Sequence, residues 1–295
     1  MSQLSGMTGF ARVTGEAEWG AWAWEAKSVN GRGLDVRVNT PPGFDALERA
    51  VKTAASRRFN RGSLQVSLRI ELSDRAGGVV IDETLLKSLT SAAEQALGGP
   101  LSGEAIAALM SIKGVVETGS SSLRDVAADE AVMTVLAQGA EAALEQLDTA
   151  RRSEGQSLLA MLGELVDEMS AMTESAISLA AGQPGLLQAR LSKQLDELGA
   201  DQKVDPDRLA AELALTAAKA DVREELDRLQ AHFASARDLL ATGSPVGRKL
   251  DFLAQELNRE ANTLCSKSVS LDLTNAGLSL KGTIDQFKEQ AANVE

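Results

Sequence analysis

An unbroken helical pattern of unusual length occupies the middle of this chain of 295 residues and constrains its fold more than any other feature. Almost every residue from about 125 onward follows the three- and four-residue spacing of a helix. The segment 128–172, ADEAVMTVLAQGAEAALEQLDTARRSEGQSLLAMLGELVDEMSAM, is too long for one average globular helix without supporting contacts. We therefore expect it to form either a protruding hairpin arm or a pair of helices.

The first quarter of the chain has the two-residue alternation that is typical of β-strands. Trp22 and Trp24 alternate with small or polar residues, and apolar and polar residues alternate in LDVRVNT (34–40) and SLQVSLRIEL (63–72). Between these two segments, Asp45 can cap an amphipathic helix. The order strand–strand–strand–helix–strand predicts a small unit with a mostly antiparallel sheet.

The fold class that these patterns predict is α+β. A small, mostly antiparallel N-terminal sheet with its helix is followed by a long, mainly α-helical region. We expect an N-terminal α+β domain over 1–125, a long helical arm for oligomerisation over 126–205, and a C-terminal helical region over 206–295. In the last region the short GSPVG loop, 243–247, predicts two antiparallel helices.

Cysteine usage and the first residues of the chain bear on its compartment. The single cysteine, Cys265, excludes an internal disulfide and any zinc site built from several cysteines, and a reducing cytosol is the simplest setting. The opening residues, MSQLSGMTGF, have no basic stretch followed by an apolar run, so no signal peptide is expected. No apolar segment approaches the ~20 residues of a membrane-spanning helix. We expect a cytoplasmic protein without a membrane partner.

Charge is distributed unevenly along the chain, whose formal net charge is −12. Residues 1–75 hold 11 Lys/Arg and 8 Asp/Glu, a net charge of +3, whereas residues 76–295 carry −15. An acidic protein can still bind a polyanion, through a locally basic face or through metal ions that its carboxylates hold. Alternatively, the acidic charge only keeps a long helical region soluble.

A file of ionic residues accompanies the apolar seam in DVREELDRLQAHF, 221–233. The seam steps by four, three and four residues, through Val222, Leu226, Leu229 and Phe233. One position before each lies a polar residue, and the file is Asp221, Glu225, Arg228 and His232, the only histidine. This spacing puts the file on one side of a helix, beside the seam, where partial desolvation strengthens electrostatic interactions. An ordinary ladder of salt bridges is the alternative.

The following helix, GRKLDFLAQELNREANTLCSKS (247–268), has a seam of the same kind with two polar files. The first file consists of Arg248, Asp251, Gln255, Asn258 and Asn262. The second consists of Glu256, Arg259 and Glu260. Because the two helices should be antiparallel, we expect their polar files to face a common groove.

The residue types in these files favour one reaction class. Carboxylate and amide oxygens suit Mg²⁺ or Mn²⁺, and arginine binds phosphate through two parallel hydrogen bonds. A metal held by carboxylates beside arginine is a combination that cleaves phosphodiesters. One histidine cannot supply an acid–base pair of two imidazoles, and the chain has no tyrosine nucleophile. Helical spacing alone does not distinguish this site from a structural network.

Several segments of the chain resemble signature stretches of the YicC/YloC family. They are MTGFAR (7–12), SVNGRGLD (28–35), RGSLQVSL (61–68), DVREELDRLQAH (221–232) and GRKLDFLAQELNREANTLCSKS (247–268). The ending EQAANVE is similar to the family's EQ-x-x-N-x-E, whereas the middle, about 76–200, matches only in helical character. Ala11 and Cys265 stand where the family has glycine, and neither departure removes a charged candidate residue.

The resemblance implies a bacterial cytoplasmic endoribonuclease that cuts single-stranded RNA, takes part in RNA turnover and needs a divalent metal cation, Mn²⁺ or Mg²⁺. It also implies a homohexamer that encloses RNA, and no DNA partner is expected. Aromatic residues make up only 3% of the chain, which favours recognition through the RNA backbone, with weak sequence selectivity and steep salt dependence.

Roles carried over from the resemblance fall on matched positions only. The catalytic candidates, as general base, metal ligand or proton-transfer group, are Glu224, Glu225, His232, Asp251 and Glu256. The metal-ligand candidates are Glu225, Glu256 and Glu260. The RNA-binding candidates are Arg228, Arg248, Lys249, Arg259 and Lys267 near the C-terminus, and Arg12, Asn30, Arg32 and Arg61 near the N-terminus. For the N-terminal group a structural role is the alternative: solubility of a strand edge for Arg12, and a turn for Asn30 and Arg32, since NGRG is also a good turn sequence.

Two other functions are compatible with the same residues. One is a non-catalytic RNA-binding adaptor that presents small RNA to another nuclease. The other is a helical assembly protein whose polar files form networks between subunits. The apolar seams of the middle helices would be exposed in isolation, and they therefore predict a multimer.

Overall fold

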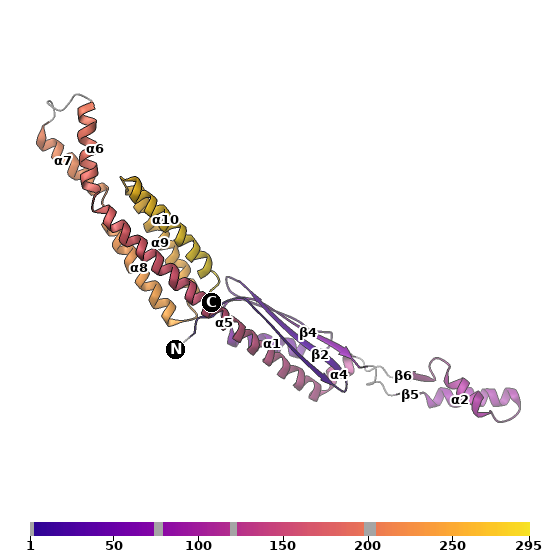
Figure 1. Cartoon of the computed structure of the whole chain (residues 1–295). Coiled ribbons are helices and arrows are strands. Elements are labelled where there is room, and N and C mark those ends of the chain that lie inside the picture. The colour runs from indigo at the N-terminus through magenta and orange to yellow at the C-terminus, as the bar shows by residue number, and fades with distance from the viewer. Residues whose placement is uncertain (1–2, 74–78, 119–122, 198–204) are drawn as a thin grey trace.

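The computed structural model describes residues 3–73, 79–118, 123–197 and 205–295, and these form an elongated molecule (Figure 1). A sheet lies near the middle of its length, a bundle of helices extends to one side, and a small lobe lies at the opposite end. The α+β class predicted from the sequence is confirmed. No helix within the described ranges is long and apolar enough to cross a membrane.

The N-terminal sheet contains four strands in the order β1-β2-β4-β3. Its elements are β1 (Gly9–Ala17), β2 (Gly20–Val29), β3 (Leu34–Asn39), α1 (Asp45–Arg58) and β4 (Gly62–Leu72). The predicted order of three strands, a helix and a strand is confirmed. β2 pairs antiparallel with both β1 and β4, whereas β3 and β4 are parallel, because α1 provides the crossover that a parallel pair requires.

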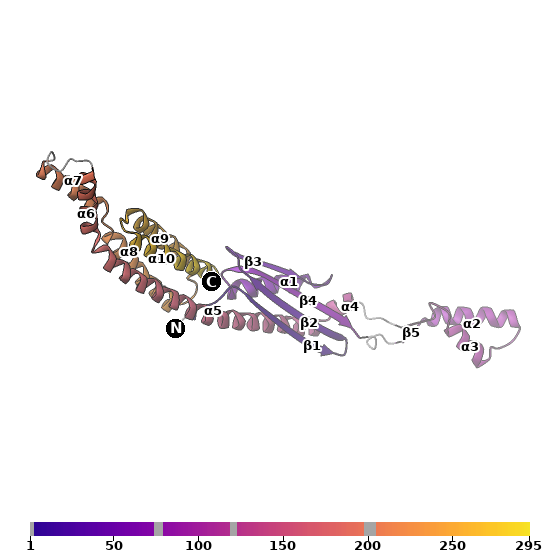
Figure 2. The same ribbon diagram turned by 45° about the horizontal axis from the view of Figure 1, so that its top comes forward.

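One face of this sheet is buried and the other is open. α1 and the first part of α5 (Glu130–Ala180) cover the face that carries Trp24, Leu64 and Val66, which are all fully buried (Figure 2). Side chains at alternate positions point to the opposite face, where Phe10 is largely exposed. The alternation of apolar and polar residues in the sequence therefore corresponds to a sheet with one covered face.

Helix α5 is continuous over 51 residues and belongs to two hydrophobic cores. Its first half buries Leu136 and Leu144 against the sheet, and its second half buries Leu162 and Val166 in the helical bundle. The sequence favoured a hairpin arm or a pair of helices for this segment, and the structure forms neither. Two successive cores supply the contacts that such a long helix needs.

The C-terminal helices complete a bundle around the second half of α5. They are α8 (Arg223–Thr242), α9 (Gly247–Lys267) and α10 (Leu271–Ala291). The prediction that α8 and α9 are antiparallel is confirmed, and they pack side by side along their length (Figure 1). Their apolar seams, which include Leu229, Phe233, Leu250 and Leu257, lie in the core as the spacing predicted.

Two pairs of helices extend beyond these cores. At one end, β5 (Val79–Ile81) and β6 (Val116–Thr118) form an antiparallel ribbon that carries α2 (Glu83–Leu97) and α3 (Gly103–Met110), and α4 (Leu123–Ala128) leads back to α5. At the other end lie α6 (Gln183–Glu197) and α7 (Pro206–Lys219). Neither α2 nor α3 contains a buried residue. These outer helices therefore contribute little to either core.

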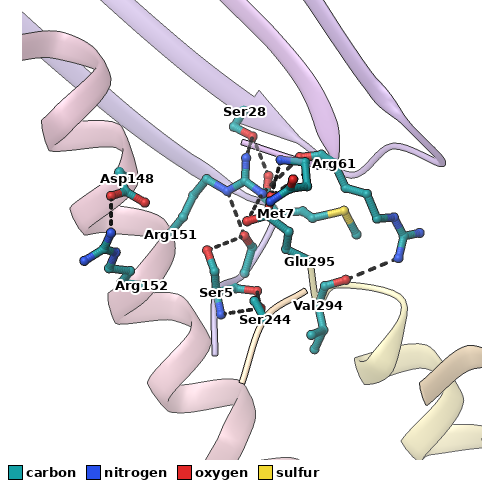
Figure 3. A network of polar contacts seen from close by, with 12 residues as sticks. Ser5, Met7, Ser28, Arg61, Asp148, Arg151, Arg152, Ser244, Val294 and Glu295 are labelled. Atoms are coloured by element: carbon teal, nitrogen blue, oxygen red, sulfur yellow. Dashed lines mark hydrogen bonds and ion pairs between the residues drawn. The ribbon is translucent and has the colours of Figure 1, made fainter. Parts of the chain in front are cut away.

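A buried ion pair connects the sheet with the bundle (Figure 3). Arg151, in the middle of α5, is fully buried, and its Nη2 lies 3.2 Å from Oε2 of Glu295. Its Nε donates to the Gly6 carbonyl at 2.7 Å, and Nη2 donates to the Arg61 carbonyl at 3.0 Å. Desolvation lowers the pKa of Arg151, and the Glu295 charge opposes that shift. The arginine thus bridges α5, both ends of the chain and the start of β4.

Glu295 extends the same connection to the α8–α9 loop. Its backbone carbonyl accepts hydrogen bonds from the amides of Val246, at 2.9 Å, and Gly247, at 3.1 Å. Its side chain accepts from the backbone amides of Asn60 and Arg61. The beginning of α9 is therefore held at a set position relative to the sheet.

We predict that Arg151→Met destabilises the protein by about 3–5 kcal/mol, because it leaves the Glu295 carboxylate buried without its cationic partner. Arg152→Met is the matched control on the same helix, since Arg152 is exposed and forms a surface ion pair with Asp148, and its cost should stay below about 1 kcal/mol. Chemical denaturation followed by circular dichroism measures both. Equal stability losses in the two variants would contradict the bridging role of Arg151.

Candidate active site

Ionic side chains from α8 and α9 meet in layers along the groove between the two helices. At one end, Lys267 Nζ donates to Glu225 Oε1 at 2.9 Å. In the next layer, Arg228 Nη1 lies 3.5 Å from Glu260 Oε2. His232 then faces α9 one turn further along α8. The polar file on α8 and the second file on α9 therefore face each other, as the sequence predicted.

The third layer gathers groups that could hold a metal ion. One ligand atom from each of His232, Glu256 and Glu260 lies within 4.8 Å of the others. Glu256 and Glu260 are four residues apart, so they occupy the same side of α9, and His232 reaches them from α8. Glu260 is only 1% exposed and the other two are half-buried, so their interactions are stronger than at an open surface.

Two arginines balance the charge of these carboxylates. Arg259 Nη2 lies 3.1 Å from Glu256 Oε2 and 2.9 Å from Glu260 Oε1. Both carboxylates hold the Arg259 guanidinium, whose pKa is raised chiefly by the hydrogen bond to Glu260. Together with Arg228, this arrangement puts two guanidinium groups beside two carboxylates and one imidazole. The same residues could contact a phosphate and a metal ion at once.

The ligand set has a metal preference of its own. Carboxylate oxygens suit Mg²⁺ and Mn²⁺ alike, whereas an imidazole nitrogen is better suited to a transition metal. One imidazole with two carboxylates therefore fits Mn²⁺ more closely than Mg²⁺.

Glu225, predicted as a metal ligand, lies outside this cluster. Seven residues, or two helical turns, separate it from His232 on α8. Its side chain is buried, Oε1 is bound to Lys267, and Oε2 has no hydrogen-bond partner among the described residues. Lys267, predicted to bind RNA, also donates to the Asp221 carbonyl at 3.1 Å. The pair thus ties the end of α9 to the beginning of α8.

Asn258 and Asn262, the later residues of the first polar file of α9, turn toward α10 instead of α8. Asn258 Nδ2 donates to Asp285 Oδ1 on α10 at 2.9 Å, and Asn262 donates to Asn258. Asp251, a catalytic candidate, accepts from Gln255 at 3.2 Å and is not part of the metal-ligand cluster. The expectation that both files of α9 share one groove with α8 is therefore wrong for Asn258 and Asn262, because α10 packs against that side. Arg248 of the same file does line the space between α8 and α9.

Glu224 and two of the N-terminal candidates, Arg61 and Asn30, have polar partners within the chain. Glu224 is exposed and forms an ion pair with Arg228. Arg61 donates to the carbonyls of Gly31 and Val294, and Asn30 donates to Asn293, so both help to join the sheet to the C-terminus. These contacts match the structural alternative for the two residues.

Arg12 and Arg32 present exposed side chains near or on the sheet. Arg12 lies on the open face of the sheet, 3.7 Å from Glu25. The backbone carbonyl of Arg32 accepts from Arg248 Nη2 at 3.3 Å. Arg248 thereby links α9 with the β2–β3 turn, so that Arg32, Arg248 and exposed Lys249 lie together at one end of the groove.

Cys265 is not a candidate nucleophile. Burial raises the pKa of its thiol, which lowers the fraction of reactive thiolate. Its Sγ lies against Gly277 of α10, where an added Cβ would approach to 2.6 Å. Gly277 thus makes room for the cysteine at a close helix contact.

Sequence reasoning did not anticipate three features of this region. It expected Glu225 with Glu256 and Glu260 as the metal ligands, and it did not place His232 among them. It did not find Asp285, or a mostly apolar cavity of about 700 Å³ at the α5–α6 and α7–α8 junctions. Both depend on how helices distant in sequence pack together.

Comparison with known proteins confirms the resemblance seen in the sequence. The family model described as endoribonuclease YicC-like, N-terminal region, matches residues 4–160, and the model described as endoribonuclease YicC-like, C-terminal, matches residues 178–295. A relative named "Probable endoribonuclease YicC" from Haemophilus influenzae is 34% identical over 301 residues, which cover 98% of this chain and 99% of the relative. A relative of the same name from Clostridioides difficile is 26% identical over 299 residues, which cover 98% of this chain and 99% of that relative. The chain belongs to the YicC-like endoribonuclease family.

Proposed function

We propose that this protein is a metal-dependent endoribonuclease that cleaves single-stranded RNA in the groove between α8 and α9, and that it contributes to RNA turnover. The cluster of His232, Glu256 and Glu260 beside two arginines is the observation that carries the proposal. The names of the relatives support the general activity. The ionic contacts among these residues support the proposed location in that groove.

In this proposal His232, Glu256 and Glu260 hold a divalent cation, with Mn²⁺ as the better fit. When bound, the cation supplies Lewis acidity at the scissile phosphate and lowers the pKa of water. Arg228 and Arg259, which now neutralise the carboxylates, are then available to contact the phosphate. The ion pair between buried Glu225 and partly exposed Lys267 keeps the helices in register.

RNA leaves the groove, in this proposal, toward the sheet. Arg248 and Lys249 are exposed beyond the cluster, and the Arg248 contact joins them to the β2–β3 turn with Arg32. Arg12 continues the basic side chains onto the open face of the sheet. These residues would contact phosphates, which position RNA without reading its sequence.

The proposal extends to assembly as a homo-oligomer, with a hexamer as the family resemblance implies. The apolar seam of α5, which the sequence treated as exposed, is covered within the chain. Support comes instead from the α2–α3 lobe, which has no buried residue in either helix and exposes Leu97 (73%), Ile106 (37%) and Ile112 (43%). Such a lobe gains stability when a second copy covers it.

We predict that the protein binds Mn²⁺ and that Glu256→Gln or His232→Asn weakens binding by about tenfold or more, since each removes one ligand. Electron paramagnetic resonance of free Mn²⁺ measures the affinity without any need for activity. Glu168→Gln, which alters an exposed carboxylate on α5, is the matched control. Unchanged Mn²⁺ affinity in both ligand variants would exclude this cluster as the metal site.

We also predict that purified protein cuts end-labelled single-stranded RNA with Mn²⁺ or Mg²⁺ and not with EDTA. Glu256→Gln should slow cleavage by about 10²-fold or more, because stabilisation of charge at the reacting phosphate is lost. Glu168→Gln should cleave like the wild type. RNA that is bound but never cut would overturn the catalytic proposal in favour of the adaptor.

Finally, we predict a multimer at micromolar concentration, measured as mass by multi-angle light scattering. Leu97→Asp, which places a charge on the exposed apolar side of α2, should lower the mass. Glu94→Gln, which replaces a carboxylate by a neutral amide on the same helix, serves as its control. A wild-type monomer would refute the assembly, and loss of assembly in Glu256→Gln would favour a subunit-interface role for the polar files.

A further inference from the structure

Exposed aromatic side chains are rare in this protein. The chain has six phenylalanines, three tryptophans and no tyrosine, and the structure describes all nine. Only Phe10, on the open face of the sheet, and Phe252, on α9, are exposed. Phe252 is 64% exposed although the other phenylalanines of the bundle, Phe233 and Phe287, are buried. A single exposed ring needs no functional explanation by itself, so any role for Phe252 has to be argued from the residues around it.

Phe252 lines a shallow groove of about 550 Å³ between α8 and α9. Two leucines belong to its lining, and its polar walls combine residues of both helices. They are Ser235, Asp238 and Thr242 from α8, and Arg248 and Lys249 from α9. The groove therefore offers an aromatic face, two cations and a set of oxygen atoms within one small space.

This groove continues the candidate active site. Phe252 precedes Glu256 by four residues, so it lies one turn along the same side of α9, a rise of about 6 Å. On α8, Ser235 follows His232 by three residues in the same direction. An RNA strand with a phosphate at the cluster would place a neighbouring nucleotide near Phe252.

The charged groups in the groove have unused hydrogen-bonding capacity that a ligand could fill. Lys249 Nζ and the Asp238 carboxylate have no hydrogen-bond or ion-pair partner among the residues that the structure describes. Arg248 uses one of its five N–H donors, on the Arg32 carbonyl. The two cations complement a phosphate, and the ring complements the face of a base.

The remaining walls favour particular bases. Ser235 Oγ donates to the Ala231 carbonyl at 3.0 Å, and Thr242 Oγ1 donates to the Asp238 carbonyl at 2.8 Å. Each hydroxyl hydrogen is thereby used within α8, so these oxygens, like the Asp238 carboxylate, face a ligand as acceptors. Adenine, cytosine and guanine present an exocyclic amino group to such acceptors, whereas uracil presents only its single N3–H donor.

We propose that this groove is a binding subsite for one nucleotide of single-stranded RNA, next to the cleaved phosphate. The base stacks on Phe252, its amino group donates to Asp238, and Arg248 and Lys249 bind the adjoining phosphate. The subsite rests on the proposed function, since it takes the α8–α9 groove as the path of the RNA. It gives the enzyme a preference for amino-bearing bases at one position.

Binding of fluorescein-labelled oligonucleotides in EDTA tests the subsite without cleavage. Phe252→Ala should weaken binding of oligoadenylate by about tenfold, and Phe252→Trp should retain it, because a single stacking contact is lost or kept. Leu278→Ala, an exposed apolar residue of α10 outside the groove, is the matched control and should bind normally. Asp238→Asn should reduce the preference for oligoadenylate over oligouridylate.

Substrates with a single abasic position identify the stacked base. At one position, removal of the base should weaken wild-type binding and leave Phe252→Ala unaffected, since both changes remove the same contact. An additive effect at every position, wild-type affinity in Phe252→Ala, or a change of assembly mass in that variant would overturn the subsite. If the protein cleaves RNA with metal and Phe252→Ala binds RNA like the wild type, the subsite alone is refuted. If binding depends on Phe252 but no RNA is cleaved, the proposed catalysis alone is refuted.

Discussion

The buried contact between Arg151 and Glu295 is the interaction on which the rest of the structure depends. It lies where the two cores meet, and it joins residues that are far apart in the chain: the middle of α5, the segment before β1, the start of β4 and the C-terminal residue. A buried ion pair adds little net stability over a well-packed apolar pair, but it is costly to break. Its effect is therefore to select one relative arrangement of sheet and bundle.

Close backbone approaches reinforce this arrangement. Gly155, one turn after Arg151 on α5, lies against the Leu4 carbonyl, where a Cβ would approach to 2.0 Å. Gly247 lies equally close to the Val294 carbonyl at the beginning of α9. Glycine weakens a helix interior, so its presence at the middle of α5 fits a crossing point that no larger residue would permit.

The candidate active site depends on this connection through α9. The same helix begins at the Glu295 contact, carries Arg248 and Phe252 next, and then Glu256 and Glu260. Any tilt of α9 would move the basic end of the groove, the aromatic ring and the metal-ligand cluster together. The salt bridges of Arg228 and Arg259 keep two acids together in a low-dielectric groove where they would otherwise repel each other.

What the sequence determined by itself was local: strands and helices with their buried sides, the antiparallel pair α8 and α9, and the family to which the motifs belong. Periodicity specifies these features because each is a property of a single element or of two elements joined by a short loop. The tertiary structure alone decided the rest. The helical sequence pattern of α5 is the same whether one hydrophobic core or two cover the helix. The two polar files of α9 are equivalent in the sequence until α10 packs against Asn258 of the first file, which turns Asn258 toward Asp285 and leaves Glu256 and Glu260 facing His232.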